Sequence, residues 1–292
     1  MNKKAKRINP EEWEMFGGGY TADSYFHVSE EKWILKLYAE FMNPEMPLRE
    51  LEVAEKLIYS GIKVPQPVAY VTDGLRYGGV FERIMDKKSF SRLLSESPEK
   101  LDEVAKKFAD LTLMLHDVDC PETAFPSIAE KCKRDVMRAK CVDKYQKEAL
   151  LKFIDDTPIV RKCLHGDLNL GNVIFADGVD PMFIDLGDFG WGNPLFDLSM
   201  FYFTAFYTNE ELQQHLYHLS TEMMQKVWNA FAKYYFAGKD IAAEEAKIKD
   251  YCVFNAIHYA NLSGWNKNLQ AVVDEFFQRH PVDYPQEETD AE

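Results

Sequence analysis

Hydrophobic and polar residues alternate in several short stretches of the first 84 residues, and this pattern predicts strands. The alternation covers residues 25–28, 33–37, 67–71 and 77–84, and the last two stretches are separated by an Asp73-Gly74 turn. Between the second and third stretches, apolar residues recur at helical spacing from Pro47 to Ser60, and Gly61 ends the pattern. These residues therefore predict a small antiparallel sheet with one inserted helix.

The pattern changes to helical spacing beyond residue 84. Ser97 and Pro98 are predicted to begin a helix with apolar positions from Leu101 to Leu115, with Ser97 as the N-cap. Residues 196–279 are also helical in pattern and unusually aromatic, whereas residues 174–184 flank an Asp-Gly turn and predict a hairpin. The fold class is α+β, with two expected domains: a sheet with one helix over residues 1–84, and a larger, mostly helical part over residues 85–292.

Composition and charge narrow the classes of protein. The 292 residues are 46% hydrophobic and 28% charged, which is typical of a globular chain. The net charge of −14 argues against a nucleic-acid or anionic-membrane partner, since both need a cationic surface. Five cysteines form no C-x-x-C pair, which fits a reducing compartment, and no apolar run is long enough for a membrane span. We therefore expect a cytoplasmic protein.

One segment carries a pattern of oxygen ligands. Asn172 follows Asp167 by five positions, and Asp185 follows Asn172 by thirteen, at the other end of the predicted hairpin. Mg²⁺ takes one or two protein oxygens together with substrate phosphates and water. Asn172 and Asp185 are therefore predicted to share a metal, which leaves Asp167 to face an acceptor hydroxyl.

This segment resembles the aminoglycoside phosphotransferase and choline kinase group of the protein-kinase-like phosphotransferases. The resemblance rests on H-G-D-x-x-x-x-N beginning at His165, on Ile184-Asp185, and on the segment 192–198. It implies a two-lobe fold and transfer of the γ-phosphate of ATP, with Mg²⁺, to a hydroxyl of a small molecule. Asp167 would be the catalytic base. The sequence does not separate ATP from GTP, and it leaves the oligomeric state open.

The same resemblance implies nucleotide-binding residues in the N-terminal sheet. Lys36 would contact the α- and β-phosphates and pair with Glu50; Glu52 is the rival, because helix register prevents both glutamates from facing the same way. A glycine-rich turn at residues 17–24 departs from G-x-G-x-x-G but would cover the phosphates. The remaining implied residues are Gly18, Gly19, Thr21 and Ser24 in this turn, and Phe81, Glu82 and Ile84 in a hinge for the adenine.

Three further positions have less direct roles. Asp188-Phe189-Gly190 imitates the kinase D-F-G motif, but the spacing assigns the metal to Asp185. Asp188 could instead contact a second metal or a cationic substrate, or make a structural hydrogen bond. His165 and Asp197 are implied to support the catalytic loop.

Two other functions compete with this interpretation. A protein kinase would carry arginine where this chain has Gly166, and only eleven residues separate Asp185 from Asp197, too few for a peptide-docking segment. A non-catalytic nucleotide-binding regulator is disfavoured because all the key positions are present.

The acceptor pocket is expected between the helices after Asp197 and inserted helices near residues 127–153. A charge of −12 over residues 85–292 mildly favours an amine-bearing acceptor such as an aminoglycoside, a choline-like compound or an amino sugar, while neutral sugars and homoserine stay open. The candidate lining residues are Trp191, Asn255, His258, Tyr259, Asn261 and Trp265.

Overall fold

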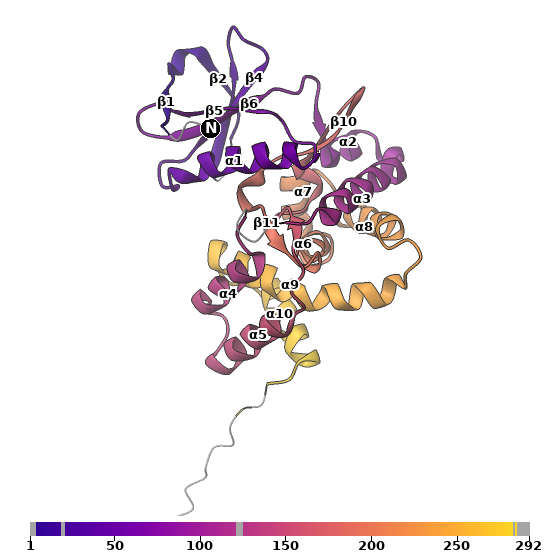
Figure 1. Ribbon diagram of the computed structural model, residues 1–292. Coiled ribbons are helices and arrows are strands. Elements are labelled where there is room, and N and C mark those ends of the chain that lie inside the picture. The colour runs from indigo at the N-terminus through magenta and orange to yellow at the C-terminus, as the bar shows by residue number, and fades with distance from the viewer. Residues whose placement is uncertain (1–3, 19–20, 121–124, 283, 285–292) are drawn as a thin grey trace, which may run out of the picture.

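The computed structural model describes residues 4–18, 21–120, 125–282 and 284. In it, a six-stranded sheet occupies the N-terminal part of the protein (Figure 1). The strand order is β1-β5-β6-β4-β3-β2, and all neighbours are antiparallel except β1 and β5. This confirms the predicted sheet. The strands are β1 (Lys6–Arg7), β2 (Trp13–Gly18), β3 (Ala22–His27), β4 (Trp33–Tyr38), β5 (Pro67–Thr72) and β6 (Tyr77–Glu82).

The predicted helix is α1 (Glu45–Tyr59), which lies between the sheet and the helical part (Figure 1). Leu51 packs close to Gly79 of β6: a Cβ added at this glycine would lie only 3.3 Å from the Leu51 side chain. Val53, Ala54 and Leu57 are buried in the main core with residues of the helical part. Helix α1 is therefore fixed on both sides, which gives its polar residue Glu50 a defined position.

The rest of the chain is mainly helical, which confirms the α+β class. A short 3₁₀ turn, Pro98–Lys100, precedes α3, and Ser97 makes no side-chain capping bond, so the predicted N-cap at Ser97 was wrong. The helix begins at Leu101 because the Ser97-Pro98 bend is absorbed by the tighter turn. The helices are α2 (Phe90–Glu96), α3 (Leu101–Asp117), α4 (Ile128–Arg138), α5 (Lys144–Asp156), α6 (Leu195–Phe206), α7 (Glu210–Tyr217), α8 (Thr221–Tyr235), α9 (Ile241–Ser263) and α10 (Lys267–Arg279).

Short strands also occur among the described residues of the helical part. They are β7 (Lys88–Ser89), β8 (Lys162–Leu164), β9 (Val173–Ala176), β10 (Val179–Phe183) and β11 (Gly190–Gly192). β9 and β10 form the predicted hairpin, and β8 pairs with β11. The domain boundary near Met85 stays a prediction; β6 ends at Glu82, and β7 begins at Lys88.

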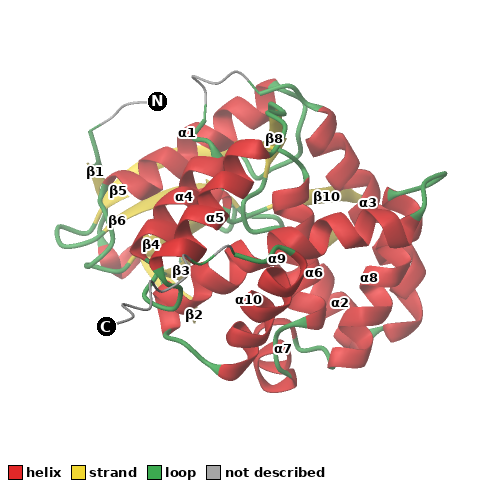
Figure 2. Ribbon diagram, turned by 90° about the horizontal axis from the view of Figure 1, so that it is seen from below, coloured by secondary structure: helices red, strands yellow, loops and turns green. Residues whose placement is uncertain are grey.

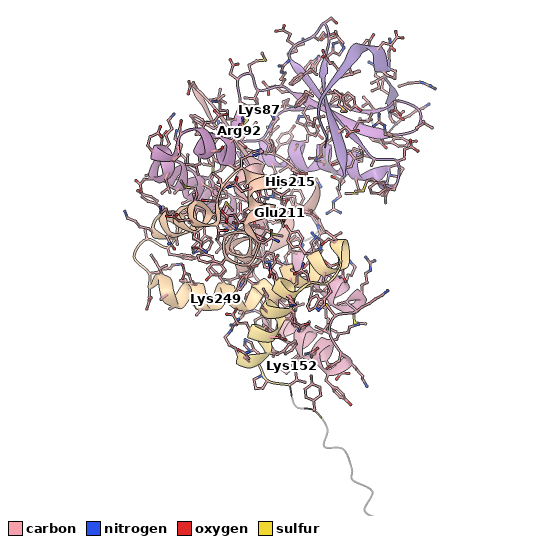
Figure 3. The ribbon with its side chains drawn as sticks, turned by 180° about the vertical axis from the view of Figure 1, so that it is seen from behind. Lys87, Arg92, Lys152, Glu211, His215 and Lys249 are labelled. Atoms are coloured by element: carbon pink, nitrogen blue, oxygen red, sulfur yellow. The ribbon has the colours of Figure 1, made fainter. Side chains whose placement is uncertain are left out.

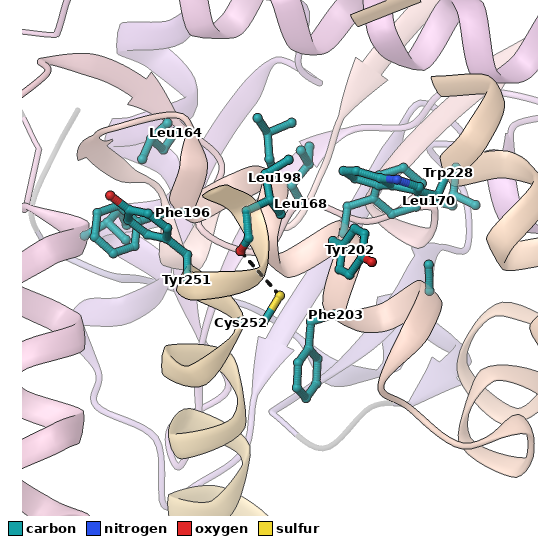
Figure 4. Close-up of a cluster of buried hydrophobic side chains, with 14 of the residues drawn as sticks. Leu164, Leu168, Leu170, Phe196, Leu198, Tyr202, Phe203, Trp228, Tyr251 and Cys252 are labelled. Atoms are coloured by element: carbon teal, nitrogen blue, oxygen red, sulfur yellow. Dashed lines mark hydrogen bonds between the residues drawn. The ribbon is translucent and has the colours of Figure 1, made fainter. Parts of the chain in front are cut away.

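Helix α6 forms the centre of the helical part, between α8 and α9 (Figure 2). Nearly every residue of α6 is buried, including Phe201, which packs against Trp228 and Phe231 of α8. On the α9 side, the Cys252 thiol donates to the Ser199 carbonyl oxygen at 3.7 Å (Figure 4). Because α6 is packed on two sides, its N-terminal end is a rigid support for the loop that precedes the hairpin. Within the described residues, no helix combines the length and apolar character that a bilayer crossing requires.

Candidate active site

The loop after β8 is held in place by His165, which is fully buried. Its Nε2 lies 3.0 Å from the Ile184 carbonyl oxygen, and its Nδ1 accepts a hydrogen bond from the Asp167 backbone N–H at 3.3 Å. The ring also packs against Phe183. His165 thus connects the loop to the end of β10 and to the Asp167 backbone, and the supporting role that the resemblance implied for it stays a prediction.

Asp197 supports the same loop from the N-terminal end of α6. Its carboxylate accepts the backbone N–H groups of His165 and Gly166 at 2.7 and 2.8 Å, and it lies 3.1 Å from Nε2 of His116. His116 in turn contacts the Tyr235 hydroxyl at 2.8 Å. Sequence reasoning missed His116 and Tyr235, because nothing in their local sequence shows that α3 and α8 meet behind the loop.

Asp167 and Asn172 are in direct contact. The Asn172 amide donates to both the Asp167 side chain and the Asp167 carbonyl oxygen, each at 2.9 Å. The pKa of Asp167 is raised, chiefly because burial disfavours its charged form, and also because the Asp185 and Asp188 carboxylates repel a further negative charge. A carboxylate with increased proton affinity is suited to take a proton from a hydroxyl.

Lys36 connects the sheet to the end of the hairpin. Its ammonium group lies 3.1 Å from Glu50 and 2.8 Å from Asp185. Burial alone would lower the pKa of Lys36, but the two carboxylates outweigh it and raise that pKa well above its usual value. Between the two rival glutamates, it is Glu50 that contacts the lysine; it also accepts hydrogen bonds from the Tyr38 hydroxyl and from the Leu186 N–H.

Asp185 has a strained backbone. Its φ and ψ of 60° and 62° are left-handed, a region that residues other than glycine seldom occupy. The Ile184 N–H donates to the Asn172 carbonyl oxygen at 2.9 Å, so the two ends of the β9–β10 hairpin are held together. Strain of this kind, held by the surrounding structure, concentrates at functional sites.

A cavity of about 200 Å³ lies between the sheet and the hairpin. It brings together most of the predicted nucleotide-binding residues. Gly18 and Thr21 are described but do not line it, and Gly19 lies outside the described residues. The predicted residues that line the cavity are Ser24, Lys36, Glu50, Phe81, Glu82, Ile84 and Asp185.

Lys87 also lines this cavity and was missed from the sequence. It follows Asp86, whose φ of 54° is left-handed, and it lies where the sheet meets the helical part (Figure 3). Among the described residues it has no ion-pair partner, and burial together with the nearby Arg83 lowers its pKa. An isolated lysine in a turn carries no sequence signal that distinguishes it from a solvated surface lysine.

The other side of Asp167 faces α4 and α9. Lys131 of α4 forms an ion pair of 2.7 Å with Asp188, and His258 of α9 contacts Asp135 at 2.8 Å. His258, Asn261 and Trp265 line a cavity of about 580 Å³ in this region. Of the other residues expected to line an acceptor pocket, Asn255 bonds to Ser199, Tyr259 packs against Phe203, and Trp191 lies in β11; none of the three lines this cavity.

The donor set at the hairpin fits a magnesium ion with few protein ligands. The described residues contain no group of three or more His, Cys, Asp or Glu side chains that could hold a metal on its own. Asn172 and Asp185 offer two oxygen donors, and Mg²⁺ commonly keeps water and substrate phosphates for its other positions. The residues are therefore compatible with a metal that arrives with a nucleotide.

The small sheet, the mostly helical part and the loop between them define a protein-kinase-like phosphotransferase. The model of the phosphotransferase enzyme family matches residues 12–235, and the chain belongs to this family. Its members transfer phosphoryl groups, so the protein is an enzyme of that class.

Solved structures show the same fold. A thermostable mutant of the aminoglycoside phosphotransferase APH(4)-Ia has a TM-score of 0.61 at 13% identity, covering 92% of this chain and 94% of that one. The ADP-bound aminoglycoside phosphotransferase APH(2'')-Ib has a TM-score of 0.57 at 17% identity and covers 91% and 92%. The amicoumacin kinase hAmiN has a TM-score of 0.59 at 15% identity and covers 94% and 89%. No curated protein sequence matches the chain.

Proposed function

We propose that the protein transfers the γ-phosphate of ATP, bound with Mg²⁺, to a hydroxyl of a small molecule. The observation that carries this proposal is the arrangement of Lys36, Glu50 and Asp185 around one cavity. The Asp167–Asn172 pair lies at the same open end of the hairpin as Asp185, because the Ile184 N–H donates to the Asn172 carbonyl oxygen, and it completes the site. Two structural neighbours support the choice of nucleotide, because APH(4)-Ia and hAmiN were each solved with AMP-PNP.

In the proposed reaction, Asp167 orients the acceptor hydroxyl and takes its proton. The hydroxyl oxygen forms a bond to the γ-phosphorus while the bond from that phosphorus to the ADP oxygen breaks. Lys36, held by Glu50, contacts the phosphates and offsets their charge. Asn172 and Asp185 would hold the metal, which would supply further charge neutralisation when bound. Most of the rate then comes from positioning and electrostatics, as is typical of phosphoryl transfer.

Gly166 supports a small-molecule acceptor over a protein substrate. Its φ is 81°, and a Cβ at this position would lie 2.1 Å from the Asp188 carbonyl oxygen. The arginine that protein kinases carry here does not fit this backbone. In addition, the eleven residues between Asp185 and Asp197 are used by a 3₁₀ turn and by β11, which pairs with β8.

The Asp167→Asn variant tests the proposal. Asparagine has nearly the same shape but does not accept the proton, so turnover should fall by about 10²–10⁴-fold while Mg²⁺–ATP still binds. ADP release is measured against a panel of hydroxylated amines, sugars and acids, with calorimetric titration of ATP and of GTP. Wild-type turnover in the variant would refute the role of Asp167. Binding of Mg²⁺–ATP without turnover of any acceptor would favour the nucleotide-binding regulator instead.

A further inference from the structure

A cavity of about 580 Å³ lies between α4 and α9. Its walls are one face of α4, with Asp135 and Arg138, and the C-terminal end of α9, with His258. A smaller cavity of about 30 Å³ shares Asp135 and His258 with it and reaches Gly166, next to Asp167. The large cavity is therefore placed to hold the body of an acceptor whose hydroxyl faces Asp167.

The carboxylates on this side already have partners. Asp188 is paired with Lys131, and the Asp135 side chain contacts His258 at 2.8 Å. The Asn261 amide also donates to the Asp135 carbonyl oxygen at 2.9 Å, so this turn of α4 is tied to α9 at two points. Among the described carboxylates on this side, Asp167 is the one that forms no ion pair with a cation or an imidazole, and the proposed reaction needs that carboxylate as its base.

The cationic side chains that line the large cavity, unlike these carboxylates, have no such partners among the described residues. Arg138 and Lys140 both line it and are exposed to solvent. Neither side chain forms a hydrogen bond or an ion pair with another described residue. Arg138 and Lys140 are separated by one residue at the end of α4, so their charges act on the same part of the cavity.

We propose that this cavity selects an acceptor bearing an anionic group, a carboxylate or a phosphate, which Arg138 and Lys140 bind while a hydroxyl faces Asp167. The inference rests on the proposed phosphotransferase function and deepens it. It departs from the amine-bearing acceptor favoured by the net charge of residues 85–292. That net charge counts the whole region, whereas the charged side chains lining this cavity that form no ion pair with a described residue are those of Arg138 and Lys140.

Matched sugars test this proposal. Glucuronate, glucose and glucosamine share one ring and carry a carboxylate, no charge and an amine, and glucose 6-phosphate provides the phosphate arm. Binding of each to the full-length protein with Mg²⁺ and AMP-PNP is measured by saturation-transfer NMR, and ADP release with ATP is measured in parallel. We expect an anionic sugar to bind most tightly. The comparison of glucuronate with glucose 6-phosphate then shows whether a carboxylate or a phosphate is preferred.

The double variant R138E/K140E should weaken binding of the preferred anionic sugar by about tenfold or more and leave Mg²⁺–ATP affinity unchanged. R134E is the matched control, because Arg134 is an exposed cation of α4 that does not line the cavity. Preferred binding of glucosamine, equal binding of all four sugars, no binding of any, or an unchanged preference in the double variant would each overturn the proposal. Failure of the wild-type protein to bind Mg²⁺–ATP would instead reject the phosphotransferase function.

Discussion

At the scale of single residues, burial raises the pKa of Asp167 most, and the charges around it adjust that pKa further. Asp185 and Asp188 both repel a negative charge on the buried Asp167 and so favour its protonated form. Asn172 and His165 act in the opposite direction. Lys131 holds Asp188, and the pKa of Asp188 is lowered because this pairing outweighs the effect of burial. The protonation of Asp167 therefore depends on a neighbour that need not touch substrate.

The Asp188→Asn substitution should move the acid limb of the rate profile to lower pH. The proposed base works only when ionised, so kcat/KM falls as the pH drops through the pKa of Asp167. Removing the Asp188 charge lowers that pKa, and the freed Lys131 lowers it further. The pH dependence of kcat/KM with the best acceptor checks the shift. Asp177→Asn, in the hairpin turn, is the control, and a limb that stays fixed or moves to higher pH in the Asp188 variant would contradict this account.

Gly166 should be intolerant of any side chain. In Gly166→Ala the new methyl group would meet the Asp188 carbonyl oxygen, and a left-handed backbone adds about 1–2 kcal/mol. We expect a total loss of roughly 2–5 kcal/mol in the free energy of unfolding, with little remaining turnover. Urea unfolding measures the loss in the free energy of unfolding, and ADP release measures turnover.

Gly178 supplies the matched control for this prediction. Its φ of 73° is also left-handed, but a Cβ there meets no atom within 4 Å. Gly178→Ala should therefore cost only the backbone contribution of about 1–2 kcal/mol and keep full activity. Equal losses in the two variants would show that the contact with Asp188 is not what excludes a side chain at Gly166.

At the scale of elements, the catalytic loop depends on helices that are distant in sequence. Helix α6 supplies Asp197, α3 supplies His116, and α8 supplies Tyr235 behind it. Asp197 is only 1% exposed, so its carboxylate is stable there because three donors surround it. The loop geometry is thus a property of helix packing as much as of the loop sequence.

The Asp197→Asn variant tests this support. An asparagine oxygen can replace part of the carboxylate, but its NH₂ group would face a donor. We expect a loss of roughly 3–5 kcal/mol in urea unfolding, together with lower turnover. Asp240→Asn is a suitable control, because Asp240 caps α9 at the surface and asparagine caps equally well. A destabilisation no larger than that of the control would mean that Asp197 is not what holds the loop.

At the scale of the whole molecule, the sequence predicted what depends on local pattern. The sheet, α1 and the hairpin follow from hydrophobic periodicity and turn residues, and the spacing of Asp167, Asn172 and Asp185 located the candidate site. Ser97 failed as an N-cap because a 3₁₀ turn competes with capping within three residues, a balance that composition does not reveal.

The contacts between distant segments could not be predicted. Lys131 meets Asp188 across 57 positions, and the choice of Glu50 over Glu52 depends on how α1 is rotated against the sheet. Lys87 and Arg138 became candidates only when a cavity appeared beside them. Chain folding brings such pairs together, and no local pattern records them.

Ligand binding should tighten the connection between the sheet and the helical part. Lys36 of β4 bridges to Asp185 across 149 positions, and the Arg49 guanidinium reaches the Phe189 carbonyl oxygen at 3.5 Å. A nucleotide with its metal would bind to both sides of this junction. By mass action, a ligand at 100 times its Kd adds about 2.7 kcal/mol to stability. The melting temperature should therefore rise by several degrees with ATP and Mg²⁺, and less with ATP and EDTA.

The Asp185→Asn variant separates the contribution of Mg²⁺ to this rise in melting temperature from the contribution of ATP. Asparagine keeps one side-chain oxygen but loses the charge that attracts both Lys36 and Mg²⁺, so ATP should stabilise the variant equally with and without the metal. Asp180→Asn, on the exposed side of the same hairpin, should keep the full magnesium dependence, because Asp180 is exposed and its ion pair among the described residues is with Lys63, at 3.5 Å. If Asp185→Asn retained the magnesium-dependent rise, the metal would have to be held elsewhere, and the junction between sheet and helices would not be the nucleotide site.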